Sequence, residues 1–167
     1  MTAMPASAAA PQSWRAPVLA ILAGGVIAGT VDIGAACLIN QVGPALILKV
    51  IASGLLGGAA IHGGEGVIVT GLVLQEVMSL AIAAVFVAGA GLVRWPRSRW
   101  IVAGLAYGPV IFLVMNLVVV PLSAAVVKHA PRPSPAAILE NLLAMLVFGL
   151  IVAGAWAWSQ RRAARPA

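Results

Sequence analysis

Long apolar runs separated by short polar or basic stretches dominate the pattern of this chain. Runs of about 20 apolar residues, long enough to cross a bilayer as helices, can be placed at 17–39, 66–91, 101–125 and 136–158. The pattern therefore predicts an all-α, polytopic membrane protein whose core is a four-helix transmembrane bundle.

Residues 43–66, between the first two runs, have a different pattern. The first half is apolar apart from Lys49 and Ser53, which are four residues apart and share one narrow polar stripe. The second half is mostly glycine and alanine. We predict an interfacial or re-entrant helix over 43–58, followed by a flexible glycine loop. A fifth span is the alternative.

The flanking segments predict one domain, the bundle at 17–158. An Ala/Pro/Ser-rich, disordered tail is expected at 1–16, and a basic cytoplasmic tail at 159–167. The first apolar run is longer than the hydrophobic region of a signal peptide, about 7–15 residues, so a spanning helix is favoured over a cleaved leader. The prolines of 126–137 predict a non-helical, extended connector there.

The basic residues give the orientation. With the N-terminus in the cytoplasm, the four-span topology places seven of the ten Lys and Arg residues inside. These seven are Arg15, Arg94, Arg97, Arg99, Arg161, Arg162 and Arg165. The three outside are Lys49, Lys128 and Arg132. We therefore expect a bacterial inner-membrane protein with both termini cytoplasmic, and all five tryptophans also fall at the cytoplasmic ends. Five spans would move Trp14 to the other face.

Composition agrees with a membrane protein. The chain is 62% hydrophobic and 8% charged, with a mean hydropathy of +1.08. Those values exclude a soluble globule, a disordered chain and a coiled coil. The net charge of +6 would suggest nucleic acid in a soluble protein. Here the basic residues stand at the ends of apolar runs, so the expected partner is the lipid bilayer and not nucleic acid.

Asp32 is the first polar residue within a span that needs an explanation. Gly25, Gly29, Asp32 and Ala36 share one helix face, and Gly25-x-x-x-Gly29 is a small-xxx-small packing surface. Asp32 should therefore point toward a neighbouring helix and away from lipid. It is a candidate proton or cation site. The alternative is a neutral, protonated carboxyl that only hydrogen-bonds the neighbouring helix.

The second span carries the strongest polar patch. Gln75, Glu76 and Ser79 share one broad face, and Gly71 lets another backbone approach. We count Gln75 and Glu76 as candidate ion-binding residues. The alternative is interhelical hydrogen bonding, worth about 1 kcal/mol per bond or less.

The last two spans add fewer polar groups. Asn116 shares a stripe with Pro109 and Phe112, and the prolines predict a kinked helix. Glu140 lies near the start of the last span, where an acidic residue complements the helix dipole and Ser134 can cap the helix.

These polar positions all fall in the outer half of the predicted bundle. We therefore predict a one-sided acidic vestibule that takes a proton or a cation. The proposed ion-binding residues are Asp32, Gln75, Glu76 and Asn116, and the proposed supporting residues are Lys49, His62, Ser79 and Glu140.

Catalytic and metal signals are missing from the sequence. It has no H-E-x-x-H, Walker loop, G-x-S-x-G or C-x-x-C, and its single cysteine, Cys37, allows no internal disulfide. Both histidines lie outside the predicted spans. We expect no catalytic residue, no metal and no cofactor.

Three segments carry a resemblance. AGTVDI at 28–33, IASGLLGGAAIHGG at 51–64 and VMNLVVVPLSAA at 114–125 are similar to stretches in a group of small uncharacterised four-span bacterial membrane proteins. The resemblance covers most of residues 20–125 and implies four spans, but no activity. The second span of that group often carries a histidine where Gln75 stands. The resemblance also marks Asp32, Asn116, Pro121 and Ser123 as positions to test.

Two functions fit these observations. The first is proton- or cation-linked transport or sensing of a small solute through the acidic cluster. The second is a non-catalytic accessory or scaffold subunit whose polar residues only register the helices. An enzyme acting on lipid or quinone is a weaker third hypothesis. Because two predicted helices carry small-xxx-small surfaces, we also expect a homo-oligomer or a complex with another membrane subunit.

Overall fold

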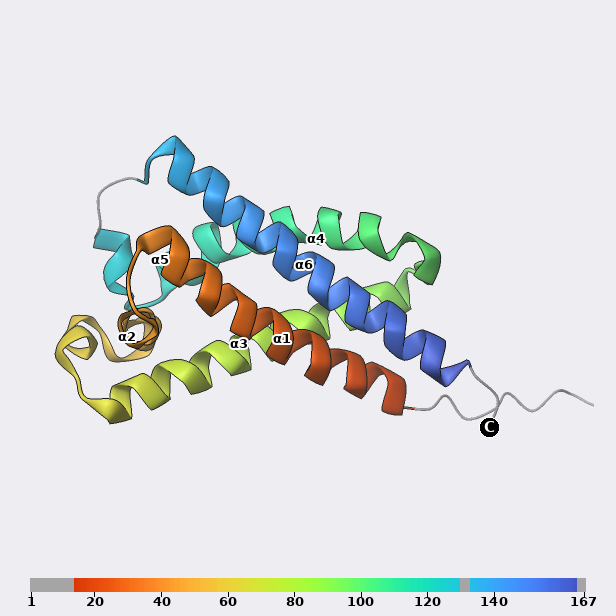
Figure 1. The fold of residues 1–167 in the computed structure, drawn as a ribbon, viewed down its shortest axis with the longest axis horizontal. Helices are drawn as coiled ribbons and strands as arrows, with labels where there is room; N and C mark the ends of the chain where they lie inside the picture. Colours follow the sequence, from red (N-terminus) through yellow and green to blue (C-terminus); the bar gives the residue numbers. More distant parts are fainter. Residues whose placement is uncertain (1–13, 130–132, 165–167) are drawn as a thin grey trace, which may run out of the picture.

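The computed structural model describes residues 14–129 and 133–164, and this part of the chain is helical, with no strand. Four segments are long and apolar enough to cross a membrane, which confirms the predicted fold class (Figure 1). They are α1 (Arg15–Asn40), α3 (Glu65–Leu92), the α4 segment (Arg97–Leu122) and α6 (Pro135–Ala163). The α4 segment contains the 3-10 turn η2 (Arg97–Arg99), α4 (Trp100–Val114), the π-helical turn η3 (Met115–Val119) and α5 (Val120–Leu122).

The predicted re-entrant or interfacial segment is α2 (Pro44–Leu56). Its 13 residues extend about 20 Å as a helix, which is shorter than the hydrocarbon core of about 30 Å. Figure 1 shows α2 end-on, so it runs across the long axis of the bundle. A fifth span is therefore excluded. The following glycine loop is partly ordered, since Gly58–His62 form the 3-10 turn η1.

Four long helices pack in the spatial order α3, α1, α6, α4. Neighbouring glycines let α1 approach both of its partners. A Cβ at Gly25 would lie 3.0 Å from the Cα of Leu80 on α3, and one at Gly24 would lie 3.3 Å from the Cα of Val152 on α6. Because these approaches are so close, backbone contacts set the position of α1.

The crossing of α4 and α6 uses the second small-xxx-small motif. A Cβ at Gly108 would lie 2.7 Å from the Cα of Leu146, and one at Gly104 would lie 2.8 Å from the carbonyl oxygen of Gly149. Both predicted glycine surfaces are thus used within one chain. The prediction of a homo-oligomer rested on these two motifs making contacts between chains, so the motifs no longer support it.

The hydrophobic core lies toward the end of the bundle that carries the arginines. The Phe86 ring packs 5.1 Å from the Tyr107 ring and 6.1 Å from the Trp156 ring, measured between centroids. The Tyr107 hydroxyl donates a hydrogen bond to the carbonyl of Ile82, 2.8 Å away. These three rings pack together where α3, α4 and α6 meet.

The ends of several segments differ from the sequence predictions. Helix α6 continues to Ala163, so most of the predicted basic tail is helical. The predicted connector begins with a 3-10 turn, Val126–His129, because these residues precede the first proline, Pro131, and keep the backbone N–H groups that such a turn needs. Ser134 caps α6 as predicted, accepting a bond from the Ala137 N–H at 3.1 Å. The tail at 1–13 and residues 130–132 and 165–167 lie outside the described residues.

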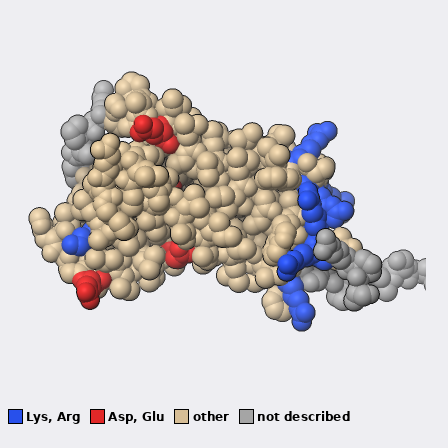
Figure 2. Space-filling model, in the orientation of Figure 1, with Lys and Arg blue, Asp and Glu red and all other residues tan. Residues whose placement is uncertain are grey.

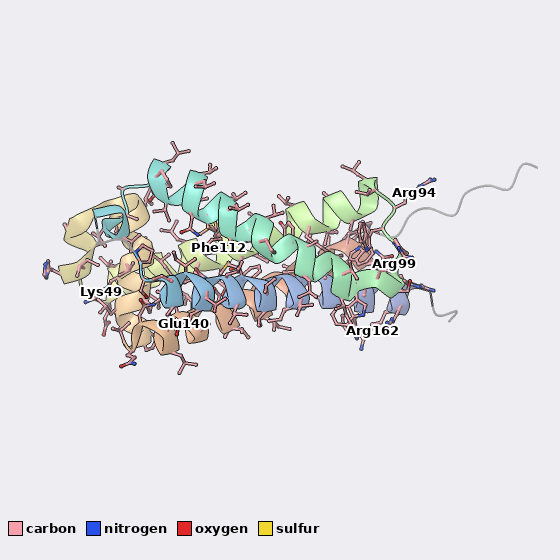
Figure 3. All side chains as sticks on the ribbon, turned by 90° about the horizontal axis from the view of Figure 1, so that it is seen from above. Lys49, Arg94, Arg99, Phe112, Glu140 and Arg162 are labelled. Atoms are coloured by element: carbon pink, nitrogen blue, oxygen red, sulfur yellow. The ribbon has the colours of Figure 1, made fainter. Side chains whose placement is uncertain are left out.

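Charge is distributed unequally along the bundle. In Figure 2 most Lys and Arg side chains gather at one end, and the Asp and Glu side chains lie toward the other half. Figure 3 labels Arg94, Arg99 and Arg162 at the basic end, with Lys49 and Glu140 at the opposite end. This is the asymmetry that orients a membrane protein.

Candidate ion-binding site

The site is built on a hydrogen bond between α1 and α3. The side-chain N–H of Gln75 donates to a carboxyl oxygen of Asp32, with Nε2 and Oδ2 3.1 Å apart. Gln75 is only 8% exposed and Asp32 is half-buried. Asp32 lies eight residues before the end of α1, about 12 Å along the helix axis. The pair therefore lies within the membrane-spanning part, in the half away from the arginines.

Gly29 brings the other two polar residues of α3 to the same place. A Cβ at Gly29 would lie 2.5 Å from Ser79 Oγ and 3.5 Å from Glu76 Oε1. The Gln75 amide nitrogen also lies 3.4 Å from the Gly29 carbonyl oxygen and donates to it. The missing side chain at Gly29 is thus what allows the polar face of α3 to contact α1.

Asp32 also lines a cavity on the other side of α1. This cavity has a volume of about 470 Å³ and lies between α1 and α6. Its other acidic residue is Glu140, which is exposed near the start of α6, and apolar side chains such as Leu38 and Leu143 line much of the rest. Two carboxyl groups that share one otherwise apolar cavity favour a cation or a proton over an anion.

Gln75 lines a different cavity, so the Asp32–Gln75 pair lies between two hollows. The second cavity, about 340 Å³, lies between α2, α3 and the outer part of the α4 segment. Ser53 holds α2 in place over it: its hydroxyl donates to the Val50 carbonyl at 2.6 Å and accepts from the Val126 N–H at 3.2 Å. The N–H of Ala124 donates to the Gly54 carbonyl at 2.9 Å.

Helix α2 also crosses α3 very closely. A Cβ at Gly71 would overlap the carbonyl group of Leu48, so only glycine fits at this crossing. Gly71 precedes Gln75 by one helical turn. The crossing therefore fixes α2 directly beside the polar face of α3.

The structure brings together five of the eight predicted residues. Four of them, Asp32, Gln75, Glu76 and Ser79, surround Gly29, and Glu140 shares a cavity with Asp32. Sequence reasoning named these residues, but it did not identify Ser53 as the anchor of α2. The signal for Ser53 was weak, because a single serine in an apolar helix usually bonds its own backbone.

Asn116, His62 and Lys49 do not join the cluster around Gly29. Asn116 is exposed on the π-helical turn, and its amide donates to the Phe112 carbonyl of its own helix at 2.8 Å. His62 is exposed at the end of η1, and Lys49 lies half-buried on α2. The predicted role of Asn116 as polar lining therefore has no support in the geometry, because its own helix already satisfies its amide.

No protein-family model, curated protein or solved structure matches this chain. The fold alone therefore defines the class. The chain is a multi-pass membrane protein, and its described residues form four helices long enough to span a membrane and one short apolar helix, α2, across the bundle.

Proposed function

We propose that this protein is a bacterial inner-membrane protein, with both termini cytoplasmic, that carries or senses a proton or a small cation through the carboxyl groups of Asp32 and Glu76. The observation that carries the proposal is the position of Asp32. Its carboxyl group bonds Gln75 and also lines the cavity that contains Glu140.

The energetic cost of this carboxyl group supports a function. An acidic residue near the centre of a span costs about 2.5–3.5 kcal/mol on insertion scales. Hydrogen bonds between membrane helices return about 0.6 kcal/mol on average. The bond to Gln75 alone therefore does not offset the cost. A proton or cation bound at Asp32 would neutralise the charge and lower this cost.

We take the Asp32 carboxyl to be reached from the Glu140 end of the bundle, along the cavity that both residues line. Glu140 lies at the end of the bundle opposite the arginines (Figure 3). On the arginine side of Asp32, Ala20 and Gly24 of α1 are buried against neighbouring helices, and the groove of about 510 Å³ between α1 and α6 there has no acidic lining residue. Sensing of the outer solution needs only this conformation. Transport requires a second conformation in which α1 separates from α3 or α6.

The test uses the purified full chain in proteoliposomes that contain a pH-sensitive or cation-sensitive dye. A gradient is imposed, and the wild type should dissipate it faster than protein-free liposomes do. Asp32→Asn should lower the rate to the protein-free level. Glu65→Gln is the matched control, because Glu65 is an exposed carboxyl at the start of α3 outside the cluster. Wild-type flux at the protein-free level, or Asp32→Asn flux at the wild-type level, contradicts carriage.

A second candidate function is an accessory or scaffold subunit. It is favoured by one observation: among the described residues, every fully buried side-chain nitrogen or oxygen has a hydrogen-bond partner. In a subunit of this kind, the polar residues serve only to fix the alignment of α1 with α3. This function predicts that Asp32→Ala loosens the assembly on a native gel, and that no variant changes flux.

A further inference from the structure

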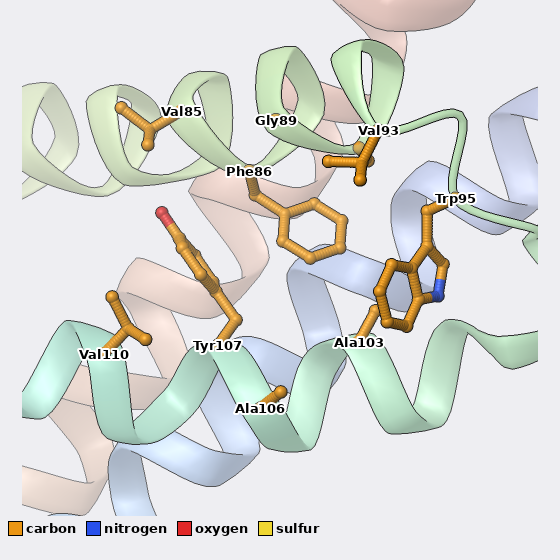
Figure 4. Close-up of a pocket in the computed structure, with 10 residues that line it drawn as sticks. Val85, Phe86, Gly89, Val93, Trp95, Ala103, Ala106, Tyr107 and Val110 are labelled. Atoms are coloured by element: carbon orange, nitrogen blue, oxygen red, sulfur yellow. The ribbon is translucent and has the colours of Figure 1, made fainter.

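The bundle has an open side between α3 and α4. Because α1 and α6 lie between these two helices on one side, α3 and α4 have few backbone contacts with each other. The Tyr107 side chain links them, through its hydrogen bond to Ile82 and its contact with the Phe86 ring. The space between them is a cavity of about 320 Å³, lined by residues of both helices such as Val85 and Ala106 (Figure 4).

Aromatic rings line this groove and leave it without free polar groups. Figure 4 shows Phe86 from α3, Tyr107 from α4 and Trp95 from the connecting loop around the same space. The Tyr107 hydroxyl donates to the Ile82 carbonyl, and the Trp95 indole N–H donates to the Arg99 carbonyl at 3.3 Å. Since these polar atoms are bonded within the protein, the groove suits a hydrocarbon chain and not a polar solute.

The groove continues along the helices. A second cavity of about 200 Å³ is also lined by Val85, Tyr107 and Val110 and extends to the π-helical turn at Met115. The long direction of the groove therefore follows the spanning helices. This is the direction in which an acyl chain lies in a bilayer.

The loop at the Trp95 end of the groove is basic. The loop between α3 and α4 carries Arg94, Arg97 and Arg99, all exposed, and residues 93–100 include no acidic residue. Arg94 has a φ of 49°, the left-handed conformation, which lets the chain turn back so that the Trp95 N–H bonds the Ala90 carbonyl at 3.0 Å. This turn holds Arg94 between Val93 and Trp95, two residues that line the groove.

We propose that this groove binds an anionic glycerophospholipid from the leaflet on the arginine side. One acyl chain lies between α3 and α4, and the phosphate contacts the arginines of the α3–α4 loop. Guanidinium groups recognise phosphate through charge-assisted, paired hydrogen bonds, and an apolar groove adds selectivity for a lipid over a free anion. The inference rests on a different face of the bundle from the acidic cluster and does not depend on the proposed function.

The test measures lipid retention by native mass spectrometry on the full chain, with phosphatidylglycerol and phosphatidylcholine of the same acyl chains. The wild type should retain phosphatidylglycerol preferentially. The double variant R97Q/R99Q should weaken retention roughly 10-fold, because it removes two cations from the phosphate. Ala106→Phe should weaken it about fivefold by filling the groove without changing the charge.

Two controls distinguish lipid binding in the groove from general attraction of anionic lipid to the arginines at this end of the bundle. R161Q/R162Q removes the same charge from the last turn of α6, and Leu105→Phe adds an aromatic ring to an exposed position of α4 that does not line the groove. Both should retain phosphatidylglycerol as the wild type does. If Ala106→Phe fails to give a monodisperse protein, Val85→Phe fills the same groove from the exposed face of α3.

Three results would overturn the proposal. The first is equal retention of the two lipids by the wild type. The second is full retention by Ala106→Phe together with loss in R161Q/R162Q, which would show that charge at this end acts without the groove. The third is a dimer that Ala106→Phe abolishes, which would show that a second copy of the chain occupies the groove.

Discussion

Gln75 on α3 donates a hydrogen bond to Asp32 on α1 across 3.1 Å, and the two residues line cavities on opposite sides of the contact. A double-mutant cycle measures how strongly the pair is coupled. Asp32→Ala and Gln75→Ala should show a coupling energy of about 0.6 kcal/mol, and no more than about 1.7 kcal/mol, in reversible unfolding from detergent micelles. The control cycle pairs Gln75→Ala with Asn116→Ala. That cycle should be additive, since the Asn116 amide bonds its own helix.

Gly29 tests whether close backbone approach supports the cluster. Gly29→Ala places a methyl group 2.5 Å from Ser79 Oγ and 3.0 Å from Ser79 Cβ, so the hydroxyl must rotate away from its place in the cluster or α1 and α3 must move apart. We expect a loss of about 1–3 kcal/mol in the free energy of unfolding. Gly34→Ala is the control on the same helix, because a Cβ there has nothing within 4 Å. Equal stability of the two variants would show that the α1–α3 contact is looser than described.

Gly108 tests the crossing of α4 and α6 in the same way. A methyl group at Gly108 meets the Cα of Leu146 at 2.7 Å, which is backbone and cannot rotate away. Gly108→Ala should lower the free energy of unfolding by about 1–3 kcal/mol, whereas Gly91→Ala, in open space on α3, should not. A stable Gly108→Ala protein would mean that α4 packs elsewhere.

Orientation is tested by reporter fusions. Arg94, Arg99 and Arg162 lie at one end of the bundle, and we expect that end in the cytoplasm (Figure 3). A C-terminal fluorescent-protein fusion should fluoresce, and a C-terminal alkaline phosphatase fusion should be inactive. A phosphatase fusion made within residues 63–64 should be active. The opposite pattern would place the acidic cluster in the cytoplasmic half.

Helix positions could be predicted from the sequence because run length alone determines them. The second predicted span, 66–91, and the observed Glu65–Leu92 differ by one residue at each end. The order in which the helices pack could not be predicted. A helix that is apolar on all sides has no preferred buried face. The close backbone approaches at Gly24, Gly25 and Gly108 determine the packing order instead.

Part of the candidate site could be predicted from the pattern of small residues along the helices. Asp32 and Gln75 each lie on a face with glycine, so their meeting follows from the small-residue pattern. Asn116 lacks such a neighbour one turn away. It also lies on the π-helical turn, whose wider spacing departs from the 3.6-residue period used to place it. The cavity shared by Asp32 and Glu140 depends on the packing of α1 against α6, which no short-range pattern encodes.

Access of water to position 32 tests the account most directly, because carriage and sensing both require it. In a Cys37→Ala background, Asp32→Cys and Thr30→Cys are treated from the outer side with a membrane-impermeant thiol reagent. Thr30 is exposed on α1 at almost the same depth but does not line the cavity. We predict that the thiol at position 32 reacts at least about 10-fold faster than the thiol at position 30, because only a thiolate in contact with water is reactive. Equal rates, or no reaction at position 32, would contradict an acidic site open to the outer solution.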